Sequence, residues 1–97
     1  MTRSDLVIEL ASEFKDLTHA DAELAVDTLV EAMSQALIRG HRIEIRGFGS
    51  FSVSYRAPRM GRNPKTGEAV AIPEKRIPHF KAGKGLKAAV DEKLTQQ

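Results

Sequence analysis

The chain of 97 residues has no cysteine and no tryptophan, and it contains one tyrosine. Without cysteine it can form neither a disulfide nor a thiolate metal site, which fits a reducing compartment. No run of 18 apolar residues and no apolar segment typical of a signal peptide is present, so we expect neither a membrane span nor secretion. The length predicts one small domain, and we expect it to be cytoplasmic.

The residues that usually carry catalysis are scattered. Ser50, Ser52 and Ser54 alternate along one predicted strand and have no histidine base beside them. The histidines lie far apart in the sequence, and Ser52 stands where a phosphate-binding GxGxxG loop beginning at Gly47 would need its third glycine. We therefore expect no enzymatic activity, no metal ion and no cofactor.

The net charge of +2 hides a separation of acidic from basic residues. Residues 1–38 contain two basic and eight acidic side chains, whereas residues 39–87 contain twelve basic and three acidic ones. A chain with one strongly basic part is typical of a protein that binds a polyanion.

Two helices are predicted in the first 40 residues. Thr2 with Asp5, and Thr18 with Asp21, have the spacing of a capping box, and apolar residues follow each pair at helical spacing until Gly40. The result is a helical hairpin over residues 1–40. A DNA-reading helix-turn-helix is disfavoured, because DNA would repel the acidic residues of the second helix, which are Asp21, Glu23, Asp27 and Glu31.

The remaining residues have the alternation of β-strands and then one helix. Residues 41–55 contain two strands joined around Phe48, and a third strand, interrupted by Pro73 and Pro78, returns over residues 70–80. The sheet is expected to consist of residues 41–55 and 74–81. Residues 83–95 should form the last helix. The predicted fold class is α+β, with a helical hairpin, a three-stranded antiparallel sheet, an extended β-ribbon arm and a C-terminal helix.

Residues 56–73 are predicted to form the arm. Asn63-Pro64-Lys65-Thr66-Gly67 is a strong turn signal, and Pro58 and Pro73 lack the amide donor that a central strand needs. Four cations recur at every third position with no acidic residue among them: Arg56, Arg59, Arg62 and Lys65. We expect the second strand to continue into this DNA-binding hairpin. A solvated, flexible basic loop is the alternative.

Three further groups are candidates for DNA contacts. Lys81 and Lys84 flank the start of the last helix, where free amides and the helix dipole attract phosphate. Arg3 and Ser4 begin the first helix in a similar way. On one strand face, Glu44 lies between Arg42 and Arg46 and is expected to hold both guanidiniums. This set is either a minor-groove contact or an ordinary surface salt-bridge ladder.

The chain has more large apolar residues than a body of this size can cover. They include Phe48, Phe51 and Phe80 as well as Leu29, Met33 and Leu37 of the second predicted helix. We expect these residues to form the core of an obligate, intertwined dimer whose single chain is not independently stable.

These motifs resemble the HU and integration host factor family of bacterial DNA-bending proteins. The similar segments are Gly47 to Phe51, Arg56 to Arg59, Gly61 to Gly67, Pro78 to Lys81 and Gly83-Lys84, and the match covers essentially the whole chain. The segments from Arg42 to Arg46 and from Tyr55 to Arg59 most resemble the beta subunit of integration host factor. That resemblance implies a heterodimer with a homologous alpha subunit, in the bacterial nucleoid.

The resemblance also implies how DNA is bound. Two arms would follow the minor groove of double-stranded DNA and bend it sharply, with Pro64 inserted between base pairs, as in known minor-groove benders of this family. It implies roles in recombination, transcription, translation and nucleoid organisation. The implied DNA-binding residues are Arg3, Ser4, Arg42, Glu44, Arg46, Arg56, Arg59, Arg62, Asn63, Pro64, Lys65, Lys75, Lys81 and Lys84.

Two alternatives differ in measurable ways. A sequence-tolerant, HU-like homodimer would bind random duplexes as tightly as any one site. An RNA-binding basic protein would usually carry stacking aromatic residues, and the predicted arm has none.

Overall fold

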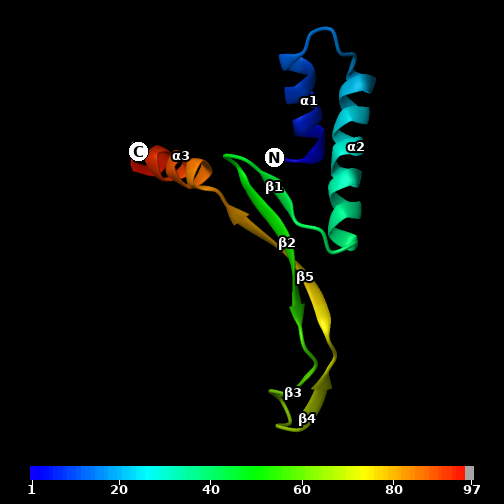
Figure 1. Ribbon diagram of the computed structural model, residues 1–97, viewed down its shortest axis with the longest axis vertical. Helices are drawn as coiled ribbons and strands as arrows, with labels where there is room; N and C mark the ends of the chain where they lie inside the picture. The colour runs from blue at the N-terminus through cyan, green and yellow to red at the C-terminus, as the bar shows by residue number, and fades with distance from the viewer. Residues whose placement is uncertain (96–97) are drawn as a thin grey trace.

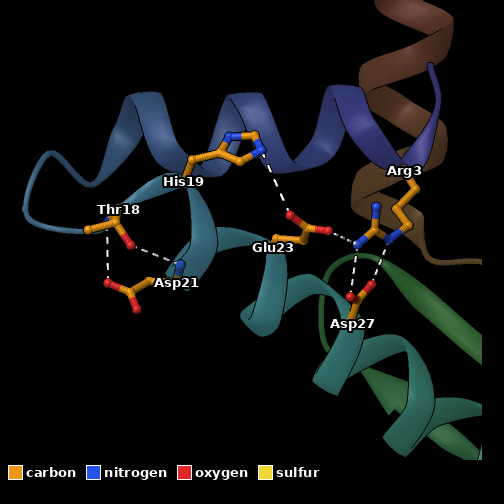
Figure 2. A network of polar contacts seen from close by, with 6 residues as sticks. All are labelled: Arg3, Thr18, His19, Asp21, Glu23 and Asp27. Carbon is orange, nitrogen blue, oxygen red and sulfur yellow. Dashed lines mark hydrogen bonds and ion pairs between the residues drawn. The ribbon is translucent and has the colours of Figure 1, made fainter.

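The computed structural model describes residues 1–95, with side chains described through residue 92. The first two helices, α1 (Arg3–Glu13) and α2 (His19–Ile38), lie side by side as a hairpin (Figure 1). Both predicted capping boxes are present. The hydroxyls of Thr2 and Thr18 accept the amides of Asp5 and Asp21, whose carboxylates accept the threonine amides in return (Figure 2 shows the second pair). These local contacts define where each helix begins.

Few side chains are buried. Among residues 1–92 the buried ones are Val7, Ala22 and Val26, which join α1 to α2 with Leu10 and Ala11 packed beside them. Large apolar side chains elsewhere stay exposed, including Leu29 at 62% and Ile38 at 69%. A core this small cannot offset the conformational entropy lost on folding.

The sheet is antiparallel with strand order β1-β2-β5, formed by β1 (Ile43–Ile45), β2 (Gly49–Arg56) and β5 (Lys75–Ala82). The prediction that Pro78 interrupts the last strand is wrong. β5 runs through Pro78, which pairs with Val53. The reason is that β5 is an edge strand of this sheet, and an edge strand tolerates the missing amide donor of proline.

The arm is a separate two-stranded ribbon made of β3 (Arg59–Arg62) and β4 (Ala69–Ile72). The second strand leads into the arm with an interruption, because pairing stops at Ala57-Pro58 on one side and Pro73-Glu74 on the other. Each interruption contains a proline, which cannot donate to a ladder. The arm extends away from the helices and gives the chain a long axis of 60 Å (Figure 1).

The last helix, α3 (Lys84–Thr95), follows β5 directly and lies beyond the sheet, apart from the α1–α2 hairpin (Figure 1). Three aromatic rings meet near this end of the sheet. Phe80 lies 5.4 Å from Phe48 and 4.7 Å from Phe51, measured between ring centroids. Phe48 and Phe80 remain 44% and 38% exposed, so the single chain does not complete the core predicted for them. None of the helices within residues 1–95 is long and apolar enough to cross a membrane.

Candidate nucleic-acid interface

The arm ends in a tight turn that holds Pro64 outward. The Asn63 side-chain Oδ1 accepts the Lys65 amide at 2.9 Å, and the Asn63 carbonyl accepts the Gly67 amide at 2.7 Å. Gly67 has a φ of 75°, a conformation that glycine adopts without strain. Pro64 is exposed at this turn. The local sequence signals therefore predicted the turn correctly, and its bonds are made within the turn itself.

The cations of the arm differ in how they are engaged. Arg62 donates from Nη1 to the Gly67 carbonyl at 2.9 Å, so it also stabilises the turn. Within residues 1–92, the side chains of Arg56, Arg59 and Lys65 make no hydrogen bond or ion pair and are exposed. These three charges are available to an external anion.

Arg56 and Lys75 face each other across the last ladder position of the sheet. Like charges directly opposite on paired strands repel. Together with Arg59 they line a small hollow of about 260 Å³. Its apolar lining includes Ile72, Pro73 and Ile77. A polyanion at this position would relieve the repulsion.

A second group of cations lines a larger open hollow, about 730 Å³, between the β1–β2 turn and the start of α3. Its charged residues are Arg42, Glu44, Arg46, Lys81, Lys84 and Lys87. Five of these six residues were predicted as two separate groups, and the fold brings them together. Lys87 was not among the predicted site residues, although its position one helical turn after Lys84 is a signal that could have identified it.

Glu44 does not hold the two neighbouring guanidiniums as expected. Among the described residues it makes no ion pair with Arg42 or Arg46, and Arg42 Nη2 instead lies 3.3 Å from the Ser50 hydroxyl oxygen. Ser50 is the ladder partner of Glu44 on β2. The Arg42 side chain thus reaches across to β2 instead of contacting Glu44 on its own strand. Arg46 lies beyond the end of β1, in the turn that leads to β2.

The start of α3 is fixed against the β1–β2 turn. The Gly83 amide donates to the Phe48 carbonyl at 2.9 Å, and a Cβ on Gly85 would lie 3.1 Å from the Gly47 carbonyl oxygen. The amide of Gly83, the residue before α3, is therefore engaged within the chain. Lys81 and Lys84 are exposed beside it.

Arg3 is engaged within the helical hairpin. Its Nε and Nη2 donate to Asp27 at 2.6 and 2.8 Å, and Nη2 also lies 3.3 Å from Glu23 (Figure 2). Hydrogen bonds to Asp27 and then Glu23 raise the pKa of Arg3 above its ordinary value, and Arg3 lowers the pKa of Asp27. Sequence reasoning treated Arg3 as a free cation, because Asp27 is 24 residues away. Ser4, next to it, is exposed.

Comparison with known proteins agrees with this architecture. Integration host factor subunit beta from Cupriavidus metallidurans is 59% identical over 96 residues, covering 99% of this chain and 71% of the relative. The same subunit from Dechloromonas aromatica is 56% identical over 94 residues, covering 97% of this chain and 100% of the relative.

Solved structures show the same fold. HU from Anabaena in a cocrystal with DNA superposes with a TM-score of 0.79 at 37% identity, over 93% of this chain and 97% of that one. A mutant of HU from Thermotoga maritima superposes with a TM-score of 0.66 at 30% identity, over 93% of this chain and 99% of that one. The family model described as "Bacterial DNA-binding protein" matches residues 1–91. The chain therefore belongs to this family of bacterial DNA-binding proteins, which includes HU and integration host factor.

Proposed function

We propose that this chain is an architectural DNA-binding subunit that bends duplex DNA by laying its β-ribbon arm along the minor groove. The observation that carries the proposal is the arm itself. It projects from the body, ends in an exposed Pro64, and presents three cations, Arg56, Arg59 and Lys65, that have no partner within the described residues. An apolar wedge on a basic ribbon can unstack a base step while its charges hold the flanking backbone.

The basic hollow of the body supplies the second contact area. Its cations lie around the β1–β2 turn and the start of α3, at the end of the sheet opposite the arm (Figure 1), and they would bind the phosphates of DNA that has bent towards the body. Arg46, in the turn beside this hollow, is the proposed reader of minor-groove width. Arg42, Lys81 and Lys84 are proposed as phosphate contacts, with Lys87 added to them.

The functional unit is proposed to be a dimer with a homologous alpha subunit, associated with the bacterial nucleoid. The exposed Leu29, Ile38, Phe48 and Phe80 need a partner to cover them. Relatives named integration host factor subunit beta, 59% and 56% identical to this chain, favour the heterodimer over the HU-like homodimer.

The test uses the chain purified with its alpha partner and a short duplex carrying a donor and an acceptor dye at its two ends. Binding should raise energy transfer, because bending brings the ends together. Structured RNA should compete poorly for the protein, and a random duplex should compete less well than a preferred site. Binding without any rise in energy transfer would contradict the proposal.

A further inference from the structure

The connection between the arm and the sheet is narrow. The ladder of the sheet ends at the pair Arg56 and Lys75, and the ladder of the arm begins at the pair Arg59 and Ile72. Four residues therefore join the two ribbons without strand pairing: Ala57 and Pro58 on one strand, Pro73 and Glu74 on the other. The direction of the arm depends on the backbone angles of these four.

Three of the four junction residues have restricted backbones. Pro58 and Pro73 have φ fixed by their rings. Ala57 precedes a proline and is kept out of the helical region by its neighbour. Glu74 is neither a proline nor followed by one, so it is the junction residue with ordinary freedom. Whatever holds Glu74 limits how far the arm can swing.

Glu74 is held by the single tyrosine of the chain. The Tyr55 hydroxyl donates to Oε2 of Glu74 at 2.6 Å, across the two strands at the base of the arm. Tyr55 is the ladder partner of Arg76, two residues after Glu74. The hydrogen bond therefore runs diagonally from the end of the sheet ladder into the junction. The hydrogen bond to Glu74 is the main cause that raises the pKa of Tyr55 above its ordinary value, and desolvation adds to it.

The charge of Glu74 needs an explanation in this setting. It lies in a basic region, next to Lys75 and near Arg76 and Arg56, where an acidic side chain opposes the binding of DNA. Glu68, the other acid of the arm, has no bond from its carboxylate among the described contacts, whereas the Glu74 carboxylate accepts a short one. A structural role at the junction accounts for the position of Glu74.

We propose that Tyr55 and Glu74 are positioning residues: their hydrogen bond, the arm-root bond, fixes the angle of the arm to the sheet before DNA is bound. The inference rests on the proposed function, because a preset arm matters only if the arm binds DNA. Fixing the junction in advance removes part of the ordering cost of association and so raises affinity. The two residues need not contact DNA themselves.

A double-mutant cycle on the dimer tests the inference. Tyr55→Phe keeps the ring and removes only the hydroxyl. Without DNA, it should lower the ¹⁵N order parameters of residues 59–72 relative to those of the sheet. It should also weaken binding to an intact duplex by about threefold to tenfold, the range expected for loss of one hydrogen bond. In a Glu74→Ala background, the same substitution should change neither quantity.

Glu68→Ala is the matched control, since it removes one negative charge from the arm without touching the arm-root bond. It should tighten DNA binding slightly and leave the order parameters unchanged. The inference is overturned if Tyr55→Phe leaves either the order parameters or the affinity unchanged. It is also overturned if Tyr55→Phe weakens binding equally in both backgrounds, because the hydroxyl would then act elsewhere. The order parameters are measured without DNA, so they report on the bond even if the parent protein fails to bend DNA.

Discussion

Arg3 and Asp27 form a two-pronged ion pair that joins the first turn of α1 to the middle of α2. Nε of Arg3 lies 2.6 Å from Oδ1 of Asp27, and Nη2 lies 2.8 Å from Oδ2. Both side chains are about half exposed, at 47% for Arg3 and 50% for Asp27. Exposed pairs contribute little to stability on average, although bidentate arginine geometry is the favourable case. The pair therefore links the two helices and engages a cation that was predicted to bind phosphate.

Replacing Arg3 should change the titration of Asp27. In Arg3→Ala the pKa of Asp27 should rise towards the value of a free aspartate, because the hydrogen bond from Arg3 is the main cause of its lowering. A carboxyl with a lowered folded pKa stabilises the fold above its unfolded pKa and loses this effect as pH falls through the folded one. As the pH falls, the parent protein should thus lose a contribution to its stability that Arg3→Ala lacks.

The measurement for Asp27 is an NMR titration of its side-chain carboxyl. Lys15→Ala serves as the control, because Lys15 is the other lysine or arginine within residues 1–38. An equal shift in both variants would mean that net charge, and not the ion pair, sets the pKa of Asp27.

DNA binding should depend steeply on salt. If the arm and the basic hollow neutralise roughly six to ten phosphates, the slope of log affinity against log salt should be on the order of −5 to −9. Arg3 and Arg62 already have partners within the chain, which favours the shallower end. Affinity measured by fluorescence anisotropy over a salt series gives the slope. A value near −1 would contradict a wrapped arm.

Pro64→Ala should separate bending from binding. The substitution keeps every cation of the arm and the turn bonds from Asn63, but it removes the rigid apolar wedge at the tip. Unstacking costs a few kcal/mol per base step and is recovered only through the contacts that a bent duplex allows. End-to-end energy transfer on an intact duplex should fall clearly, with a smaller loss of affinity for a duplex nicked at the kink. Full bending by Pro64→Ala would identify the tip as an ordinary turn.

Arg46→Ala should reduce preference for a specific site more than it reduces affinity for random DNA, because an arginine in the minor groove reads its width. Lys87→Ala is the control from the same hollow and should lower both affinities about equally. Glu44→Ala should leave the preference intact, since Glu44 does not pair with Arg46 among the described residues. Parallel gel shifts on site and random duplexes decide. If Arg46→Ala lowers the affinity for site and random duplexes equally, Arg46 contributes only its charge.

Gly49→Ala should destabilise the sheet. A Cβ at this position would lie 2.5 Å from the Lys81 carbonyl oxygen and 2.7 Å from the Phe80 ring, and the φ of 158° is one that other residues rarely adopt. We expect a loss of roughly 1–3 kcal/mol, the usual cost of a strained backbone residue. Thermal unfolding at fixed dimer concentration measures it, with Gly83→Ala as the control because its Cβ would meet only ordinary contacts at 3.4 Å.

Local patterns in the sequence predicted much of the structure. The capping boxes at Thr2 and Thr18 and the turn at Asn63 depend on residues a few positions apart, and all three are present. The errors arose where contacts are distant or depend on strand position. Pro78 is tolerated because β5 is an edge, and the pairing of Arg3 with Asp27 needs the folded hairpin. The arm-root bond of Tyr55 and Glu74 likewise depends on strand register, which the sequence does not specify.

The incomplete core also bears on how much of the protein a cell can keep. Only Val7, Ala22 and Val26 are buried among residues 1–92. A newly made subunit without its partner therefore exposes apolar side chains, as a misfolded chain does, and is open to chaperones and proteases. Surplus copies should be cleared quickly, and pairing would protect those that remain. The abundance of one subunit would then follow that of the other after synthesis, which keeps the two in equal supply without matched expression.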